Sequence, residues 1–314
     1  MAMKNFSLTP RAKKILVPIV MIATIYLGLG IGLKIWQTRL IFFPPSEITR
    51  TPKDIGINYR ELWISVDGQK MNAWWIPSRR AERPVVLYLH GNSSNLSDLV
   101  EEIQIFYEMN LAVLAIDYRG YGASQGDFPT EKSVYEDALA AGIYLTHDRK
   151  IPEGKIFLYG HSLGGAIALD LASRFPRIGG AIIEGSFTSI GEMIDYRIPV
   201  PIYPKGLLLN QRFDSINKIR SLRIPLLLIH GKLDQVVPAF MSRKLYEASG
   251  SPERSLLIIP DVGHNNLGQK GGKIYRQAIL NFIENAEKRW FFRTCTVENS
   301  SSSLSAQQCS KVDK

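Results

Sequence analysis

Residues 155–175, KIFLYGHSLGGAIALDLASRF, decide the fold. The run KIFLYG has the length and composition of a buried strand, and the small and apolar residues from Leu163 onward repeat with a helical period. Between the two lies Gly160-His161-Ser162-Leu163-Gly164, whose small residues allow a turn sharp enough to push the serine hydroxyl outward. A strand, such a turn and a helix form the context of a nucleophile elbow, and the alternative is a glycine-rich turn without chemistry.

The chain from Arg60 onward alternates short apolar strands with helical stretches, as expected of one α/β domain. The segments 60–66 and 71–77 flank the turn Asp67-Gly68 and predict an antiparallel hairpin. Six nearly continuous apolar runs are typical of parallel strands covered on both faces; they lie at 85–90, 111–117, 155–160, 180–185, 225–230 and 255–260. Helical patterns fill 97–109, 130–146, 163–175, 239–249 and 273–290. We therefore predict an α/β fold with an eight-stranded, mostly parallel sheet and helices on both faces.

Two segments depart from this alternation. Residues 186–222 are longer than a simple crossover and contain IPVPIYPKGLLL at 198–209, so we expect a small cap-like insertion over the strand ends. Residues 294–314 are polar and rich in serine, and we expect a disordered tail there. The predicted catalytic domain is therefore 60–293.

A serine hydroxyl needs a base, which in this topology follows the serine and an acid along the chain. Among five histidines, His264 alone follows the last predicted strand, and we expect structural roles for His90 and His230. Asp234, after the strand at 225–230, is the expected acid, and Asp261 is its rival because it lies three residues before the base.

Attack on a carbonyl also creates negative charge, which requires hydrogen-bond donors held in place beforehand. In this arrangement one donor is the amide of the residue after the nucleophile and the other comes from the loop after the third strand. We expect the backbone amides of Leu163 and Asn92 to form this oxyanion hole, and the alternative for Asn92 is an ordinary turn residue. Asp117 precedes the serine, and we interpret it as structural.

The N-terminal region indicates a membrane. Residues 15–33 carry no charge, and a helix of that length spans about 28 Å, enough to cross a bilayer core. The net charge of +9 is concentrated near this segment, since residues 1–60 hold nine Lys and Arg against two acids. This distribution disfavours nucleic-acid binding. We expect a basic segment at 1–14, an anchor at 15–33 and a juxtamembrane linker at 34–59, with a cleaved signal peptide as the alternative.

Two further expectations depend on that anchor. Four bases and no acids precede it, which favours an N-terminus inside and a catalytic domain on the exocytoplasmic side. Because the linker is short, the domain should stay close to the membrane, and Trp36, Phe42 and Phe43 suit the headgroup zone. Cys295 and Cys309 are the only cysteines, and both a disulfide and two free thiols remain open.

The ordered motifs resemble those of the α/β-hydrolase superfamily over residues 60–290. They are His90-Gly91-Asn92, Asp117 to Gly122, Gly160 to Gly165, Gly231 to Pro238 and Gly263-His264. With the N-terminal anchor, Leu40 to Pro45 and Asp67-Gly68, the chain is similar to membrane-anchored α/β-hydrolase domain-containing serine hydrolases, relatives of protein depalmitoylases and of monoacylglycerol and lysophospholipid lipases. The resemblance implies Ser162 as nucleophile, Asp234 as acid and His264 as base, with Asn92 and Leu163 at the oxyanion hole. The depalmitoylases carry an N-terminal cysteine cluster, whereas this chain has no cysteine before Cys295.

These observations favour a membrane-tethered serine esterase or thioesterase acting through an acyl-enzyme. The substrate would be a lipid-like acyl ester or thioester, and no metal or organic cofactor is implied. The alternatives are a serine peptidase of the same fold and a non-catalytic membrane scaffold. A peptidase of this fold normally brings a propeller or large cap, and a scaffold would be expected to lack part of the triad.

Overall fold

The computed structural model describes residues 9–81, 83–198 and 203–299. An eight-stranded sheet with the order β1-β2-β4-β3-β5-β6-β7-β8 forms its centre. Strand β2 alone runs against the others, because it pairs antiparallel with both β1 and β4, and all remaining pairs are parallel. The bounds are β1 Arg60–Val66, β2 Gln69–Ile76, β3 Val85–Leu89, β4 Ala112–Ile116, β5 Ile156–His161, β6 Gly180–Glu184, β7 Leu226–Gly231 and β8 Arg254–Ile259. The predicted fold class and all eight strands are confirmed.

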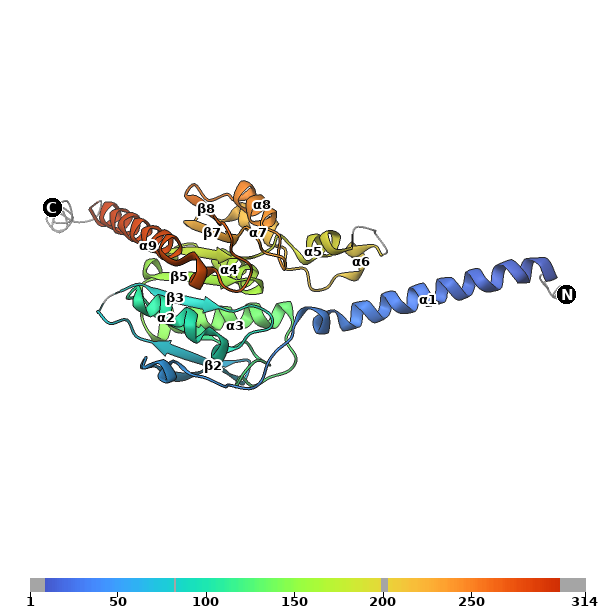
Figure 1. Cartoon of the computed structure of the whole chain (residues 1–314), viewed down its shortest axis with the longest axis horizontal. Coiled ribbons are helices and arrows are strands. Elements are labelled where there is room, and N and C mark those ends of the chain that lie inside the picture. Colours follow the sequence, from blue (N-terminus) through green and yellow to red (C-terminus); the bar gives the residue numbers. More distant parts are fainter. Residues whose placement is uncertain (1–8, 82, 199–202, 300–314) are drawn as a thin grey trace.

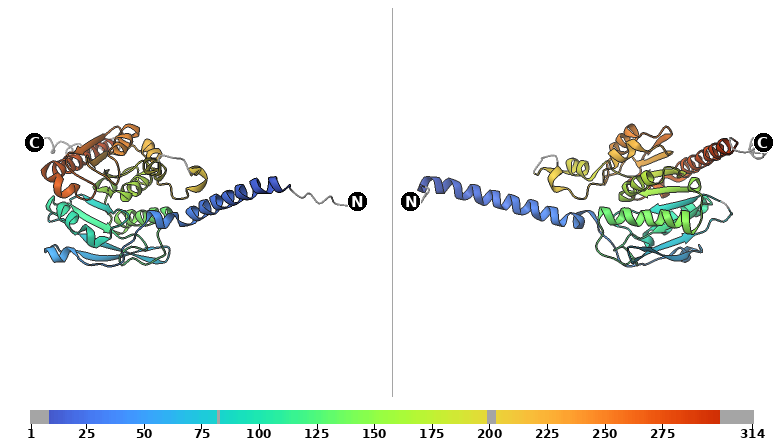
Figure 2. Two further views of the ribbon diagram at one scale, coloured as in Figure 1. Left: turned by 45° about the vertical axis from the view of Figure 1, so that its right-hand side comes forward. Right: turned by 180° about the vertical axis from the view of Figure 1, so that it is seen from behind.

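Helices cover both faces of this sheet (Figures 1 and 2). One apolar core joins the sheet to α3, α4, α7 and α8, and a second joins the other face to α2 and α9. Strand β3 is buried along its whole length, as expected of a strand covered on both faces. The bounds of these helices are α2 Val100–Glu108, α3 Glu131–Ile143, α4 Leu163–Arg174, α7 Ser215–Ser221, α8 Phe240–Ala248 and α9 Leu267–Asn299.

The predicted insertion at 186–222 divides into two parts. Helices α5 (Ile190–Arg197) and α6 (Lys205–Leu208) project from the sheet edge on the side where the chain leaves toward its N-terminus (Figure 1). Helix α7 packs against α4 and α8 with Ile219 fully buried, so it belongs to the layer of helices that covers the sheet. The cap is therefore smaller than the sequence indicated.

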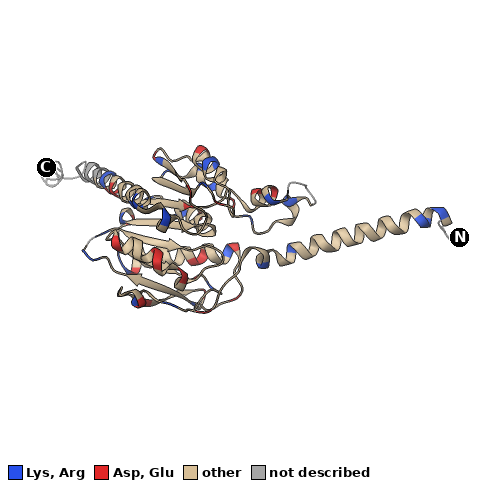
Figure 3. Ribbon diagram, in the orientation of Figure 1, with Lys and Arg blue, Asp and Glu red and all other residues tan. Residues whose placement is uncertain are grey.

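Helix α1 (Pro10–Ile41) extends beyond the predicted anchor at both ends. Its 32 residues correspond to about 48 Å, its mean hydropathy is 2.3 in the most apolar window, and basic residues flank its uncharged middle (Figure 3). The first part of the predicted linker at 34–59 is thus helical, and Pro18 lies two turns inside the helix. Among the described residues this is the one helix long and apolar enough to cross a membrane.

Two predictions about the chain ends need correction. Phe42 was expected in the headgroup zone, but it is buried in the core against Phe213, whereas Trp36 and Phe43 are exposed. Helix α9 continues to Asn299, six residues into the predicted disordered tail, and residues 300–314 lie outside the described part of the chain. Cys309 lies in this range, so its pairing with Cys295, one of the two open alternatives, lies outside the described residues.

Candidate active site

Ser162 occupies a tight turn between β5 and α4. Its backbone has φ 54° and ψ −117°, a strained combination for a residue with a side chain. Glycine is required on both sides, because a Cβ at Gly160 would collide with the Gly164 backbone and one at Gly164 would collide with the carbonyl of Leu89. The Ser162 amide donates to the Glu184 carbonyl on β6 at 2.8 Å. The predicted strand, turn and helix are present, and their packing holds the serine in place.

The structure brings Ser162, Asp234 and His264 together at the carboxyl edge of the sheet. The Ser162 hydroxyl donates to His264 Nε2 at 3.0 Å, and His264 Nδ1 donates to Asp234 Oδ2 at 2.6 Å. These residues follow β5, β7 and β8, so three parallel strands deliver them to one place. The rival acid Asp261 is exposed in a turn with φ 57°. Of the two candidate acids, Asp234 is therefore the one that contacts the base.

The Asp234 carboxylate is held in its ionised form. Burial acts to raise its pKa, but hydrogen bonds from His230 and His264 outweigh burial and hold the pKa below the ordinary range. Its Oδ1 also accepts from the amides of Val236 and Val237, both at 2.8 Å. A fixed negative charge thus faces the His264 ring.

His230 contributes to this site in a way that the sequence did not reveal. Its Nδ1 accepts from the Ser242 hydroxyl at 2.7 Å, and its Nε2 donates to the Val237 carbonyl at 2.9 Å. The same Nε2 lies 3.1 Å from Asp234 Oδ2. The expected structural role therefore takes a specific form, which is to position the acid.

A second histidine beside the nucleophile was also not assigned. His161 Nε2 donates to the His264 carbonyl at 3.0 Å, and the two rings lie 5.0 Å apart. Burial, followed by repulsion from His264, lowers the pKa of His161 to about 4. His161 is therefore neutral at pH 7 and fixes the loop that carries the base.

The loop after β3 lies against the nucleophile. A Cβ added at Gly91 would lie 3.5 Å from Ser162 Cβ, in van der Waals contact, so the backbone of this loop passes directly beside the nucleophile. The Asn92 carbonyl accepts from the Tyr121 hydroxyl at 2.8 Å and from the Phe43 amide at 3.1 Å, and Asn92 Nδ2 donates to the Ile41 carbonyl at 2.7 Å. The segment that ends α1 thus fixes the position of Asn92.

Leu163, the other predicted oxyanion residue, begins α4. The first amides of a helix have no partner within the helix, and the helix dipole favours negative charge at this end. Leu163 and Asn92 thus come from two different elements near Ser162, one from a helix start and one from the loop that contains Gly91. His90 and Asp117 support this loop from the core: His90 Nδ1 donates to the Gly91 carbonyl at 2.7 Å.

A buried acid lies beneath the elbow. The Glu184 carboxylate accepts from the hydroxyls of Tyr159 and Tyr275, the latter at 2.8 Å. Burial raises its pKa despite both bonds. Within the described ranges no group of three or more His, Cys, Asp or Glu side chains is placed to hold a metal ion.

Comparisons with known proteins identify the family of this chain. The family model described as serine aminopeptidase, S33, matches residues 80–209. The chain is 35% identical over 240 residues to the uncharacterized membrane protein YNL320W of Saccharomyces cerevisiae, covering 74% of this chain and 84% of the relative. It is 28% identical over 280 residues to the α/β-hydrolase domain-containing protein WAV2 of Arabidopsis thaliana, covering 81% and 90%. This chain belongs to the α/β-hydrolase family.

A solved structure has the same fold over most of this chain. The Pyrococcus furiosus esterase Pf2001 superposes with a TM-score of 0.65 and 22% identity, covering 78% of this chain and 98% of that structure. At this identity the match supports the fold alone. The family model includes Asn92 and Ser162 but ends before Asp234 and His264, so the contacts among the three residues come from the structure of this α/β-hydrolase itself.

Proposed function

We propose that this α/β-hydrolase is a membrane-tethered serine hydrolase that cleaves carboxylic ester or thioester bonds through an acyl-enzyme. The observation that carries the proposal is the unbroken hydrogen-bond chain from Ser162 through His264 to Asp234. A serine on a strained elbow, bonded to a histidine that is itself oriented by an ionised carboxylate, is the arrangement that serine hydrolases use for acyl transfer.

In the first step the Ser162 oxygen attacks the carbonyl carbon while His264 Nε2 accepts the hydroxyl proton. Asp234 holds the proton on Nδ1 and stabilises the imidazolium that forms. The amides of Leu163 and Asn92 donate to the developing oxyanion, and His264 then returns the proton to the leaving alcohol or thiol. Water, deprotonated by His264, then attacks the carbonyl carbon of the acyl-enzyme. The bond to the Ser162 oxygen breaks, His264 returns the proton to that oxygen, and the acid is released.

The proposed membrane tether is supported by contacts between α1 and the cap. Gln37 is 6% exposed although most of α1 is not covered by protein. Its Nε2 donates to the Leu208 carbonyl at 2.6 Å, and its Oε1 accepts from the Asn210 amide at 2.9 Å. Removal of α1 as a signal peptide would leave these cap groups without partners, so the contacts favour a retained anchor.

The cap also reaches the apolar part of the anchor. The Tyr203 ring stacks on Tyr26 at 4.5 Å, and the close approach depends on Gly30, whose added Cβ would lie 3.2 Å from the Tyr203 ring. Tyr26 and Gly30 belong to the uncharged segment 15–33, so a cap in contact with them lies at the depth of the bilayer. Ile198 and Leu207 are exposed on the same cap. A substrate that leaves the bilayer beside this cap would be lipid-like.

Carbonate extraction tests the tether. The full chain should stay with the membrane pellet, and a chain that begins at residue 42, which keeps the buried Phe42, should be released. A mature N-terminus within residues 15–33 would instead support the signal peptide. The orientation with the domain on the exocytoplasmic side remains a proposal, and protease protection of the domain in sealed vesicles should reveal it.

The alternative function is that of a serine peptidase, because the matching family model is described as serine aminopeptidase. An aminopeptidase must bind the ammonium group of its substrate, and two carboxylates at this site are already engaged: Asp234 by His264 and Glu184 by two tyrosines. We therefore expect hydrolysis of p-nitrophenyl esters to exceed that of amino-acid p-nitroanilides. Faster cleavage of the anilides would favour the peptidase.

The length of the acyl chain tests the substrate class. If residues 198–209 bind an acyl chain, each buried methylene should contribute up to ~0.8 kcal/mol, and octanoyl and longer esters should exceed acetyl esters in kcat/KM. The described part of that segment contacts α1, so the assay should use the full chain in detergent or nanodiscs. A preference for acetyl esters that is unchanged when Leu208 and Leu209 are replaced would remove the support for a lipid ester.

A further inference from the structure

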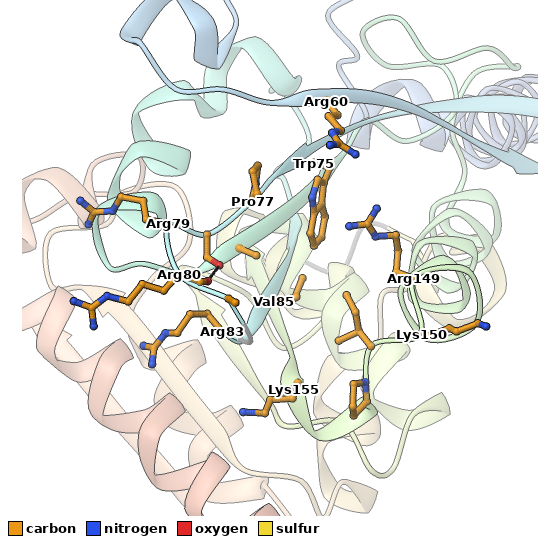
Figure 4. Close-up of a pocket in the computed structure, with 15 residues that line it drawn as sticks. Arg60, Trp75, Pro77, Arg79, Arg80, Arg83, Val85, Arg149, Lys150 and Lys155 are labelled. Atoms are coloured by element: carbon orange, nitrogen blue, oxygen red, sulfur yellow. Dashed lines mark hydrogen bonds between the residues drawn. The ribbon is translucent and has the colours of Figure 1, made fainter.

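A cavity of about 790 Å³ opens at the amino edge of the sheet, opposite the edge that carries Ser162. Val85 and Ala112, which begin β3 and β4, form part of its wall, and Lys155 directly precedes β5. Trp75 of β2 forms another part (Figure 4). We refer to this cavity as the amino-edge pocket.

The amino-edge pocket is strongly basic. Seven of its fifteen lining residues are Arg or Lys and none is Asp or Glu, although residues 61–314 contain nearly equal numbers of bases and acids. Glu82, in the loop between β2 and β3, lies outside the described residues. The bases come from three stretches of the chain; they are Arg60, Arg79, Arg80, Arg83, Arg149, Lys150 and Lys155. Figure 4 shows Arg60 and Arg149 beside Trp75, whereas the guanidinium groups of Arg79, Arg80 and Arg83 lie on the other side of the pocket and extend toward the adjoining hollow.

Neutral groups hold several of these side chains in place. Arg79 Nη2 donates to the Glu108 backbone carbonyl at 2.9 Å, and Arg83 Nε donates to the Asn110 carbonyl at 3.4 Å. The Arg149 guanidinium lies 4.5 Å from the centre of the Trp75 ring. Carbonyls and rings orient a guanidinium without cancelling its charge, so the positive charge stays available to a ligand.

Two acids approach the pocket from α9. Lys155 pairs with Glu287 at 2.6 Å, and Glu284 lines a smaller adjoining hollow together with Arg79, Arg80 and Arg83. The Glu108 carboxylate of α2 also attracts Arg79. Among the described residues, these three carboxylates are fewer than the seven bases, so the pocket keeps a net positive charge. Like charges gathered in one hollow repel one another, and a bound polyanion would relieve that repulsion.

We propose that the amino-edge pocket binds a small, soluble molecule that carries several phosphate groups. The planar fork of a guanidinium matches phosphate oxygens, and bases on two sides of the pocket suit a ligand with more than one such group. The volume is within the range of small-molecule sites. The membrane helix joins the domain at the opposite edge, where it contacts Asn92 and α6, so a lipid headgroup in the same membrane is the less suitable source (Figure 1).

Isothermal titration of the full chain in nanodiscs with inorganic tripolyphosphate tests the proposal. We expect saturable binding at about 0.15 M salt, where exposed charges beyond about 8 Å are screened. The triple variant Arg80→Gln, Arg83→Gln, Arg149→Gln should bind at least about tenfold more weakly, since a charge-assisted hydrogen bond accounts for roughly that factor. Its matched control, Arg220→Gln, Arg243→Gln, Lys270→Gln, removes three exposed bases elsewhere and should change the affinity less than twofold.

Two further arms sharpen the result. Glu284→Gln should tighten tripolyphosphate binding, because it removes a carboxylate that competes for three of the arginines. Nanodiscs that contain a phosphorylated inositol lipid should not compete with tripolyphosphate. An equal loss of affinity in the two triple variants, or no saturable binding by the unaltered chain, would overturn the proposal that this pocket binds a phosphorylated ligand. Competition by the lipid would show that the ligand is not a soluble molecule. Circular dichroism of each variant verifies the fold.

Discussion

The two edges of the sheet use charge in opposite ways. At the carboxyl edge, Asp234 is buried among four donors from His230, His264, Val236 and Val237, and every contact serves the position of one imidazole ring. At the amino edge, arginines rest on carbonyls and rings and retain their charge. The first arrangement suits bond cleavage, which needs matched partners in fixed positions. The second suits recognition of a ligand that supplies the missing negative charge.

The largest effect should come from the acid at the carboxyl edge. Asp234→Asn should lower kcat for ester hydrolysis on the order of 10⁴-fold, because an amide would favour the wrong tautomer of His264. Asp261→Asn, the matched control in the adjacent turn, should change kcat less than twofold. A larger loss of kcat in the Asp261 variant would show that Asp234 is not the acid.

Position 164 of the elbow should tolerate no side chain. Gly164→Ala places a methyl group against the Leu89 carbonyl and should lower the free energy of unfolding by about 3 kcal/mol. Gly206→Ala, where an added Cβ meets no atom within 4 Å, is the control. Chemical denaturation measures both, and equal stabilities would show that the turn can relax.

The neutral histidine beside Ser162 predicts a pH dependence of stability. In the unfolded chain His161 binds a proton near pH 6.5, whereas in the folded protein its pKa is about 4. Stability attributable to His161 is therefore complete above pH 6.5 and falls as the pH drops toward 4, by about 3 kcal/mol in total. His161→Gln should lack this component in urea denaturation between pH 4 and 7. Identical pH slopes would contradict the assigned environment.

The smallest effect should come from the ion pair at the amino edge. Lys155 and Glu287 are partly exposed, so Glu287→Gln should lower the free energy of unfolding by less than about 1 kcal/mol. Thermal denaturation at low and high salt measures this. A loss comparable to that of Gly164→Ala would remove the contrast between the edges.

Local patterns predicted much of the fold and the site. The eight strands were evident because each is a short apolar run between turn residues, and Ser162 was evident because its turn needs glycine at 160 and 164. Asp234 and His264 followed from their order after the serine. Each of these features lies within a few consecutive residues.

Contacts between distant segments were not predictable in the same way. Phe42 has the composition of an interfacial residue, and only the packing of Phe213 shows that it is buried. Gln37 meets the cap more than 170 residues away, and the amino-edge pocket gathers bases from segments that become neighbours only through the strand order. A single sequence carries no local signal for contacts between such distant segments.

Labelling with a fluorophosphonate, followed by mass mapping of the modified peptide, tests the central claim most directly. The account predicts one adduct per chain, on Ser162, and no adduct in a Ser162→Ala variant that circular dichroism shows to be folded. An adduct on another residue, or labelling that persists in the folded Ser162→Ala variant, would contradict the assignment of Ser162 as the nucleophile.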